Sequence, residues 1–316
     1  MLTISNFLSM RIFLTGSTGL VGSNLRRKLD ECGYTVLAPT RQELNLLHLE
    51  NILAYCLDVK PDMIIHAAGK VGGIQANMID LAGFLHANTI IGFNIVEAAR
   101  QCGIKKLLNL GSSCMYPKDS LSILKESDIL SGKLEPTNEG YAIAKISTMK
   151  LCEFITAESG TLHYKTVIPC NLYGEHDSFE EGKSHLIPAA IKKVHEASRS
   201  SANSNVVIWG DGTARREFMY VQDFISSLMF SINHFDDIPV VMNIGLGYDY
   251  SVKEYYEFIA EIVGFTGRFE YDLNKPSGMR RKLMDSSIQQ GLGWSPSYSI
   301  QEGLRLTYDY YIKTYS

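Results

Sequence analysis

The sequence predicts an α/β protein with a doubly wound parallel sheet and a smaller α/β cap in its C-terminal part. Three observations lead to this fold class: a glycine turn between a strand and a helix near the N-terminus, a strand–helix alternation up to residue 174, and a looser pattern after it. Alternating strands and helices form a parallel sheet with helices on both faces. Ligands bind such sheets at the carboxyl ends of the strands, so functional residues are expected there.

The first element is a strand, followed directly by three evenly spaced glycines and an amphipathic helix. The strand is Met10–Thr15, the glycines are Gly16, Gly19 and Gly22, and the helix is Ser23–Asp30. This layout is typical of a Rossmann dinucleotide-binding turn, in which the glycines permit a tight turn, the approach of a pyrophosphate and close packing of the helix. The N–H groups at the helix N-terminus then bind the phosphates. The alternative is a glycine-rich turn without a ligand.

The end of the second strand, Tyr34–Arg41, indicates which dinucleotide binds. An acidic residue here would bind the ribose 2′-hydroxyl of NAD, whereas an arginine accommodates the 2′-phosphate of NADP. Arg41 ends this strand, and Glu43 lies close by. The sequence therefore favours NADPH/NADP. Because Glu43 could bind a ribose hydroxyl, NAD is the alternative cofactor. The alternative to a binding role for Arg41 is that it is a solvated cation in a loop.

Further strands and helices continue the alternation. Lys60–Gly69 is expected as the fourth strand, with small residues at its end, and Lys105–Leu110 as the next strand. Phe84–Gln101 and Tyr141–Ser159 are expected as long helices with apolar faces. Tyr164–Gly174 is expected as a sixth strand that runs into a loop.

The two expected domains each consist of two segments. The Rossmann domain should contain residues 1–174 plus 217–249, and the cap should contain residues 175–216 plus 250–316. This division rests on residues 218–246, which are expected to return to the main sheet.

A hydride-transfer site is indicated where the strand before residue 111 meets the helix that follows it. Ser112 and Cys114 come just after the strand, and Tyr141 and Lys145 lie four residues apart on one helical face. A lysine ammonium lowers the pKa of a neighbouring phenol, so Tyr141 could exchange a proton with a carbonyl or carbinol oxygen near neutral pH. The Ser112 hydroxyl is expected to bind the same oxygen, and Cys114 adds a second proton-transfer group.

A second Tyr-x-x-x-Lys spacing occurs at Tyr271 and Lys275. It follows a strand-like segment, Arg268–Tyr271, and Pro276 comes next. Because proline disfavours a helix at the residue before it, these two side chains are not expected on one helical face. We interpret this pair as a chance match.

Composition excludes several classes of function. The chain has 316 residues, a formal net charge of −4 and 45% hydrophobic residues, which allows a substantial core in one large or two modest domains. The mild acidity gives no reason to expect nucleic-acid or membrane binding, and no apolar run reaches membrane-spanning length. The six scattered cysteines predict free thiols in a reducing cytoplasm and no metal site. Residues 1–9 do not resemble a signal peptide, and Met10 is a second candidate for the natural start.

Longer motifs identify a resemblance to a known family. Six segments carry it: 67–77 (AAGKVGGIQAN), 111–118 (GSSCMYPK), 135–145 (EPTNEGYAIAK), 171–174 (NLYG), 184–189 (SHLIPA) and 209–218 (WGDGTARREF). From about Met10 to the C-terminus, the chain resembles the extended short-chain dehydrogenases/reductases. Within that group it resembles the GDP-L-fucose synthase family, the epimerase–reductases of GDP-4-keto-6-deoxymannose. Composition and periodicity alone would not indicate this nucleotide sugar.

The resemblance assigns Ser112, Tyr141 and Lys145 to a reductase triad. It assigns Cys114 and His185 to an acid/base pair on opposite faces of the sugar, which implies epimerisation at C3 and C5 before NADPH delivers hydride to C4. A proton next to a ketone is removable when the enolate oxygen is stabilised, and Tyr141 and Ser112 are expected at that oxygen. Thiol and imidazole groups ordinarily titrate close enough to neutral pH for both transfers. The alternatives are a small buried apolar role for Cys114 and a structural loop role for His185.

The same resemblance implies the remaining contacts. For the GDP-4-keto sugar, the substrate-binding residues would be Lys193, Trp209, Arg216 and Lys282, with Trp209 beside the guanine and the cations at the diphosphate. The alternative for Lys193 is a solvated helix charge. The expected cofactor-binding residues are Gly16, Ser17, Thr18, Gly19, Leu20, Val21, Gly22, Arg41, Asn45, Leu46, Ala67, Ala68, Leu110, Gly111, Ser112, Ser113, Tyr141, Lys145, Pro169, Asn171, Leu172 and His185.

Several positions depart from the family pattern. Ser17 and Thr18 replace a His-Arg pair in the glycine loop, Gly140 replaces the proline before the catalytic tyrosine, and residues 180–183 and 275–278 differ as well. These changes surround the sugar and the cap. Two alternative functions therefore remain. One is a C4 reductase of a related GDP-4-keto sugar such as a heptose. The other is a non-catalytic NADP-binding protein, but the intact triad argues against it.

The resemblance also implies an assembly. In this superfamily, the helices equivalent to Phe84–Gln101 and Tyr141–Ser159 pack into a four-helix bundle between two subunits. Since both helices carry apolar faces, a homodimer is expected.

Overall fold

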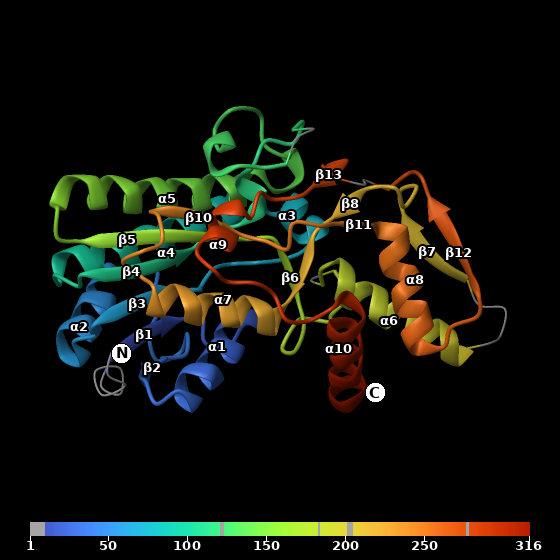
Figure 1. The fold of residues 1–316 in the computed structure, drawn as a ribbon, viewed down its shortest axis with the longest axis horizontal. Helices are drawn as coiled ribbons and strands as arrows, with labels where there is room; N and C mark the ends of the chain where they lie inside the picture. Colours follow the sequence, from blue (N-terminus) through green and yellow to red (C-terminus); the bar gives the residue numbers. More distant parts are fainter. Residues whose placement is uncertain (1–9, 121–122, 183, 201–204, 276–277) are drawn as a thin grey trace.

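The computed structural model describes residues 10–120, 123–182, 184–200, 205–275 and 278–316. The expectations for residues 1–9, concerning a signal peptide and the chain start, therefore lie outside the described residues. Figure 1 shows a six-stranded sheet at one end of the molecule, and smaller sheets and helices at the other end.

All neighbouring strands of the large sheet run parallel, in the order β10-β5-β4-β3-β1-β2. Their central residues are almost wholly apolar and buried, as in β3, because helices cover both faces of such a sheet. This confirms the predicted fold class. The six strands are β1 (Arg11–Thr15), β2 (Thr35–Leu37), β3 (Met63–His66), β4 (Lys106–Leu110), β5 (His163–Pro169) and β10 (Val241–Ile244).

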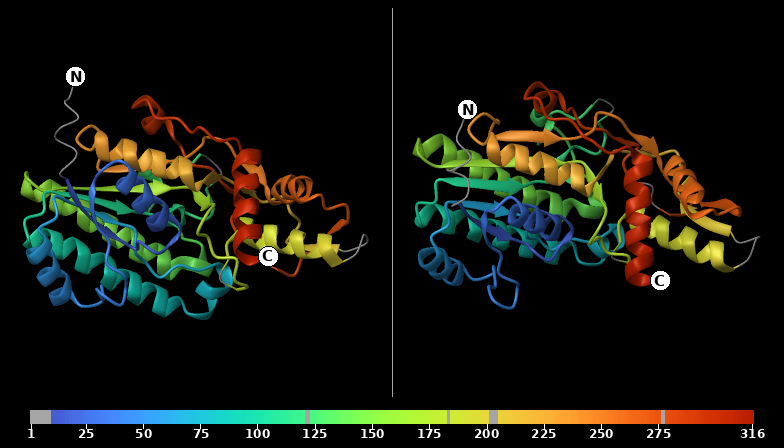
Figure 2. Two further views of the ribbon diagram at one scale, coloured as in Figure 1. Left: turned by 90° about the horizontal axis from the view of Figure 1, so that it is seen from below. Right: turned by 60° about the horizontal axis from the view of Figure 1, so that its bottom comes forward.

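Helices cover the two faces of this sheet. Figures 1 and 2 show α1 and α7 on one face, and α2, α4 and α5 on the other. A Cβ on Gly92 in α4 would overlap the Thr148 side chain in α5, so the absence of a side chain at Gly92 lets these helices pack closely. The five helices are α1 (Leu20–Glu31), α2 (Leu49–Val59), α4 (Leu81–Gln101), α5 (Glu139–Ser159) and α7 (Val221–Asn233).

The other end of the molecule consists of short strands and further helices. In Figure 1, α6, α8 and the β7–β12 pair lie farthest from the large sheet, and α10 lies between them and it. The strands are β6 (Asn171–Tyr173) with β9 (Phe218–Tyr220), β7 (Asn205–Trp209) with β12 (Arg268–Asp272), and β11 (Tyr250–Ser251), β8 (Arg215–Arg216) and β13 (Arg281–Lys282) in one sheet. The helices are α3 (Ile74–Ile79), α6 (Leu186–Ser200), α8 (Val252–Val263), α9 (Ser287–Gly291) and α10 (Ile300–Tyr315), with the 3₁₀ turns η2 (Ser113–Met115), η3 (Glu126–Asp128) and η4 (Pro136–Asn138).

The structure corrects the numbering of the strands. The strand within Lys60–Gly69 is the third in the chain, not the fourth, because the described residues between β2 and β3 form turns and α2 but no strand. Likewise, the strand expected as the sixth is the fifth, and it ends at Pro169. The predicted return of residues 218–246 to the main sheet is confirmed for β10, which pairs with β5. The domain boundaries themselves stay a prediction.

Two further expectations concern single features. Tyr271 lies in β12 and Lys275 follows it in a turn, so this Tyr-x-x-x-Lys pair does not lie on a helix, as predicted. Within the described ranges, no helix is both long and apolar enough to cross a membrane.

Candidate active site

The glycine turn lies between β1 and α1, and its backbone is tightly packed. Gly16 has a φ of +73°, and a Cβ there would lie 2.7 Å from the Ala68 backbone nitrogen. A Cβ on Gly22 would overlap the Gly16 backbone. These two positions therefore require glycine for the fold itself, Gly16 for its left-handed conformation and both for close approach.

Gly19 differs from Gly16 and Gly22 in that its backbone is not closely packed. It has an ordinary extended conformation, and a Cβ on it would meet only the Gly16 oxygen, at 3.6 Å, so the fold itself does not exclude a side chain. Gly19 precedes the first turn of α1, which contains no acidic residue and receives no side-chain cap. The N–H groups at this helix end can therefore bind a phosphate, and the bare Gly19 leaves room for it. The residues present fit the pyrophosphate of a dinucleotide.

Arg41 and Glu43 follow β2, near the glycine turn. The Arg41 side chain is exposed. The Glu43 carboxylate accepts a hydrogen bond of 2.7 Å from the Thr40 backbone N–H, and this bond holds the pKa of Glu43 below its ordinary value. The Glu43 carboxylate thus has a partner within its own turn. The assignment of Arg41 to a 2′-phosphate stays a prediction.

Most of the predicted cofactor contacts lie at or after the carboxyl ends of β1, β2, β3, β4 and β5, at one edge of the parallel sheet. The others are Tyr141 and Lys145 in α5 and His185 before α6. The side-chain amides of Asn45 and Asn171 each make one hydrogen bond within the protein. Asn45 Oδ1 accepts from the Leu47 N–H, and Asn171 Nδ2 donates to the Glu217 carbonyl oxygen. The assignment of these residues to the cofactor stays a prediction.

Ser112, Tyr141 and Lys145 meet where β4 ends and α5 begins. Ser112 caps η2 by accepting a hydrogen bond from the Cys114 N–H at 3.3 Å, and its hydroxyl is hydrogen-bonded to Tyr141. Lys145 is buried, and its Nζ donates to the Leu110 carbonyl oxygen at 2.9 Å. The three side chains therefore form one group, as the sequence predicted.

The expected effect of Lys145 on Tyr141 was wrong. Burial raises the pKa of Tyr141, a charge on Cys114 would raise it further, and only the Ser112 hydrogen bond acts in the opposite direction. The Lys145 Nζ lies 5.8 Å from the centre of the Tyr141 ring and is turned toward Leu110. Burial also lowers the pKa of Lys145 to about 8. Tyr141 is thus a protonated phenol at neutral pH, and its raised pKa makes it a weaker acid than an ordinary phenol.

Cys114 lies between two nitrogen donors. Asn138 Nδ2 lies 3.2 Å from the Cys114 sulfur, and Lys282 Nζ lies 3.8 Å from it. Lys282 is itself buried, in β13. The sequence analysis did not identify Asn138, and it assigned Lys282 to the substrate diphosphate. Neither contact is local in the sequence.

His185 directly precedes α6, and its carbonyl oxygen accepts the first helical hydrogen bond, from the Ala189 N–H. The surrounding protein and the Lys282 charge lower the pKa of His185, although its ring keeps access to solvent. Its place at a helix N-terminus disfavours a cation as well. Lys282 therefore contacts Cys114 and acts electrostatically on His185, the two members of the predicted acid/base pair.

The predicted guanine and diphosphate contacts lie on three short strands, β7, β8 and β13, and on α6. Trp209 ends β7, and the Nζ atoms of Lys193 and Lys275 lie 5.6 and 5.4 Å from its ring centre. The sequence did not indicate Lys275 as a neighbour of Trp209, because that contact depends on the pairing of β7 with β12. Arg216 lies in β8, where it pairs in register with Lys282. Their contacts with a substrate stay a prediction.

Gly140 has a structural explanation. A Cβ at this position would overlap the Leu81 carbonyl oxygen, so the start of α5 packs directly on the start of α4. The departure from the family's proline at this position therefore concerns helix packing.

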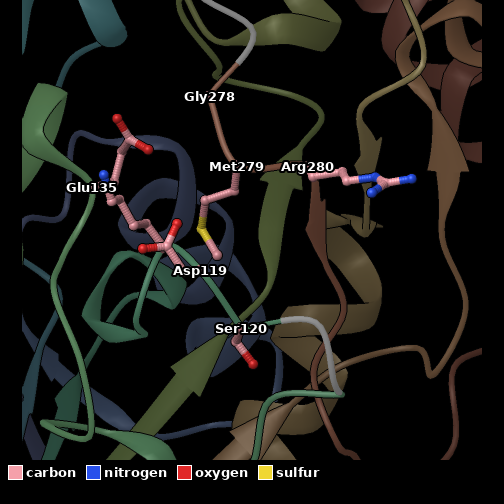
Figure 3. Close-up of a pocket in the computed structure, with 7 residues that line it drawn as sticks. Asp119, Ser120, Glu135, Gly278, Met279 and Arg280 are labelled. Carbon is pink, nitrogen blue, oxygen red and sulfur yellow. The ribbon is translucent and has the colours of Figure 1, made fainter.

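A cavity of about 460 Å³ lies beside the active site, between the segment after η2 and the segment before β13. Figure 3 shows Asp119 and Glu135 on one side of it, and Arg280 pointing away from them. None of the predicted catalytic residues lines it, but Glu135 precedes Asn138 by three residues and acts electrostatically on Arg216. Among the described residues, no group of three or more His, Cys, Asp or Glu side chains could hold a metal ion.

Comparisons with known proteins found a matching family model and nearly full-length relatives. Residues 12–245 match the NAD dependent epimerase/dehydratase family. The chain is 49% identical to a GDP-L-colitose synthase of Yersinia pseudotuberculosis, over 96% of this chain and 98% of that protein. It is 46% identical to a GDP-L-fucose synthase of Azorhizobium caulinodans, over 96% of each.

Solved structures extend the comparison. The GDP-mannoheptose C4 reductase of Campylobacter jejuni, solved with NADP bound, superposes with a TM-score of 0.87 and 29% identity, over 96% of this chain and 99% of that chain. With nearly full-length relatives well above 30% identity, the chain belongs to the GDP-L-fucose synthase family of NAD dependent epimerases/dehydratases.

Proposed function

We propose that the protein epimerises a GDP-4-keto-6-deoxy sugar at C3 and C5 and then reduces it at C4, with NADPH as the cofactor. One observation carries this proposal: the Cys114 N–H donates to the hydroxyl of Ser112, which is also hydrogen-bonded to Tyr141. A charge on the Cys114 thiol would act on Tyr141, so the thiol lies near the groups expected at the C4 oxygen. Protons removable as an enolate lie on the carbons next to such an oxygen, within reach of a thiol placed there.

As a member of this family, the protein is an NADP-dependent oxidoreductase. The glycine turn and the first turn of α1 would hold the pyrophosphate, and Arg41 the 2′-phosphate. When bound, NADPH supplies the hydride. Lys145, held by the Leu110 carbonyl, would donate to a ribose hydroxyl.

In the reduction, Tyr141 donates the proton that the C4 oxygen needs when hydride arrives. The phenol is protonated at neutral pH, and the Ser112 hydrogen bond, which acts against the rise in its pKa, fixes its hydroxyl. Proton donation by a positioned acid contributes about 10²–10⁴ in rate, so Tyr141 is expected to dominate this step.

In the epimerisation, one group removes a proton next to the ketone and another returns a proton to the opposite face. Cys114 and His185 are the candidates for these roles. The lowered pKa of His185 makes its protonated ring a stronger acid, which releases a proton readily to an enolate. Tyr141 and Ser112 would stabilise the enolate oxygen by hydrogen bonds.

The proposal is tested by NMR of the products formed in deuterated water. The panel contains the GDP-4-keto precursors of L-fucose, of L-colitose and of a heptose, which correspond to the products and substrates named for the relatives. We expect NADPH oxidation with one hexose precursor and solvent deuterium in its product. A product without deuterium from an un-epimerised substrate would disprove the epimerase half.

A C4 reductase without epimerase activity is the second candidate. The specific observation in its favour is the overlay on the GDP-mannoheptose C4 reductase. It predicts NADPH oxidation with the heptose substrate and no deuterium at C3 or C5 of the product.

We further propose that the enzyme is a homodimer formed through α4 and α5. Phe93 on α4 and Ile143 and Phe154 on α5 are partly exposed apolar side chains, which a partner subunit would cover. We also propose that it works in the cytoplasm, because all six cysteines are free thiols, as expected in a reducing compartment.

A further inference from the structure

The small sheet β11-β8-β13 carries a pair of cations on each of its two faces. Its register aligns Arg215 with Arg281 and Arg216 with Lys282. Successive residues of a strand point to opposite faces, so Arg215 and Arg281 lie on the face that Arg216 and Lys282 do not occupy. We call the face with Arg215 and Arg281 the outer face, because both side chains are partly exposed whereas Lys282 is buried. The predicted diphosphate contacts leave the outer face unused.

One buried carboxylate orients both arginines of the outer face. The Asp249 side chain is 2% exposed, and its two oxygens accept hydrogen bonds of 2.6 Å from Arg215 Nε and Arg281 Nε. Arg215 Nη2 also donates to the Asp249 carbonyl oxygen. Within the described ranges, the Nη atoms of Arg281 have no acceptor. A planar guanidinium that is already oriented loses little further freedom when it binds an anion through such atoms.

The positive charge on the outer face exceeds the negative charge. A third arginine, Arg280, forms no ion pair with any residue that the structure describes, and Figure 3 shows it pointing away from the acidic side chains of the neighbouring cavity. Besides Asp249, the carboxylate that contacts these arginines is Glu254, which lies 3.5 Å from Arg215 Nη1 and is 40% exposed. Three guanidinium groups therefore meet two carboxylates, and the balance is positive.

The three arginines line a cavity. Its volume is about 550 Å³, and its lining consists of Thr213, Arg215, Arg280 and Arg281, so no described residue that lines it is acidic. Small-molecule sites have volumes of this order. The Thr213 hydroxyl donates to Asp211, so the guanidinium groups are the donors left for a ligand. Guanidinium groups bind phosphate oxygens through pairs of parallel hydrogen bonds.

We propose that this cavity is a second anion site, which binds a small molecule through a phosphoryl or diphosphate group. The group accepts hydrogen bonds from Arg280 and Arg281, and the charge of Arg215 adds to the attraction. A carboxylate ligand has one charge and one pair of oxygens, so it would use a single guanidinium, whereas a phosphoryl group has enough oxygens for two. The site goes beyond the proposed function, since it lies on the other face of the sheet from the predicted diphosphate contacts.

The test measures the binding of inorganic pyrophosphate to the full-length protein by calorimetry at low salt. NADP at saturation keeps the cofactor site occupied. Pyrophosphate can also bind at the predicted diphosphate contacts, so the comparison between variants decides. Arg280→Met removes an arginine without an ion pair, so the fold should be kept. We expect this variant to bind pyrophosphate about tenfold more weakly at one site per chain, as for the loss of a hydrogen bond between charged groups.

Two further variants complete the comparison. Arg281→Met removes a second arginine of the cavity while Arg215 still pairs with Asp249, and should weaken pyrophosphate binding by a similar factor. Arg268→Met removes an exposed arginine of β12 that does not line the cavity, and should leave binding unchanged. Unchanged binding in both cavity variants would overturn the proposal. An equal loss in Arg268→Met would show a general attraction to positive charge and would overturn it as well.

A last arm identifies the source of the phosphoryl group. Arg216→Met removes a predicted diphosphate contact, so the pyrophosphate that this variant still binds reports on the outer face. Displacement by less GDP than inorganic phosphate would identify a nucleotide diphosphate as the ligand, and the reverse order would identify free phosphate. If Arg216→Met lost all pyrophosphate binding while Arg280→Met bound it normally, the second site would not exist. None of these titrations requires catalysis, so a failure of the proposed function would leave their result unchanged.

Discussion

The Nζ atom of Lys145 donates a hydrogen bond of 2.9 Å to the carbonyl oxygen of Leu110, which joins α5 to the end of β4. This contact fixes the ammonium at the strand edge where the cofactor is expected. It also keeps the lysine buried, and burial lowers its pKa to about 8 because the charged form is disfavoured.

The first prediction is a pH dependence of NADPH binding. Lys145 is charged below pH 8 and loses its proton as the pH rises through about 8. Because a hydrogen bond from a charged donor contributes about 1.5–3 kcal/mol, NADPH should bind about tenfold more weakly at pH 9.5 than at pH 7. Fluorescence titrations at several pH values measure this, with Lys145→Met as the control that should show no inflection near pH 8. Identical profiles for both proteins would contradict the assignment.

The second prediction concerns the choice of cofactor. Replacing Arg41 with Ala should weaken NADPH binding by about 1–3 kcal/mol, the range for a hydrogen bond to a charged group, because the 2′-phosphate loses its cation. NADH has no 2′-phosphate, so its affinity should not change. Both affinities come from the same titrations, and an equal loss for the two cofactors would remove Arg41 from the site.

The third prediction separates the two chemical steps. Cys114→Ser replaces a thiol with a much weaker acid and base, so it should lose deuterium incorporation at C3 and C5 while still oxidising NADPH. The expected product is an un-epimerised, C4-reduced sugar. Tyr141→Phe should instead cut the reduction by about 100-fold or more. NMR of both products in deuterated water gives the answer, and a Cys114→Ser product with normal deuterium would exclude the thiol from the epimerisation.

The fourth prediction concerns assembly. Light scattering at micromolar concentration should give the mass of a dimer, and Phe154→Glu should shift it toward a monomer by placing a charge on the apolar surface of α5. Leu273→Glu is the matched control, because Leu273 is equally apolar and even more exposed but lies after β12, away from α4 and α5. A wild-type monomer, or equal effects of the two variants, would refute the predicted interface.

The fifth prediction concerns stability. The buried Asp249 carboxylate accepts hydrogen bonds of 2.6 Å from both Arg215 and Arg281. Burial alone would raise its pKa, but the bonds from Arg281 and Arg215 hold it below the ordinary value. Since both arginines are partly exposed, Asp249→Asn should cost about 1–3 kcal/mol in the free energy of unfolding at pH 7.

The pH dependence of that cost follows from the lowered pKa. The stabilisation by Asp249 is present above its unfolded-state pKa, near 3.8, and is lost as the pH falls through the lower folded-state value. The difference between wild type and Asp249→Asn in urea unfolding should therefore shrink only below about pH 4. A constant difference down to pH 3 would show that the carboxylate charge is not the cause.

The predictable part of the site comes from local spacing. Gly16, Gly19 and Gly22 lie in one turn, and Tyr141 and Lys145 lie one helical turn apart, so sequence periodicity was enough to place them. Ser112 could be placed beside Tyr141 and Lys145 because the carboxyl end of a parallel strand and the start of the following helix lie at the same edge of the sheet.

The missed part depends on long-range pairing or on burial. Lys282 meets Cys114 only because β13 aligns with β8, and no local pattern encodes that register. Asn138 lies in a 3₁₀ turn, where its neighbours give no periodic signal. The pKa of Tyr141 was misjudged because spacing shows which residues are near but not how deeply they are buried. The strand count failed because the described residues between β2 and β3 form turns and α2 but no strand.

The parallel edge formed by β5 and β10 affects how the protein can be synthesised. β5 ends at Pro169, whereas its partner β10 does not begin until Val241. While the ribosome adds the intervening residues, the backbone N–H and C=O groups on that edge of β5 have no strand to pair with. Nascent chains that stall there would expose an open edge to one another, which favours aggregation. Chains terminated between residues 170 and 240 should therefore depend on chaperones for solubility.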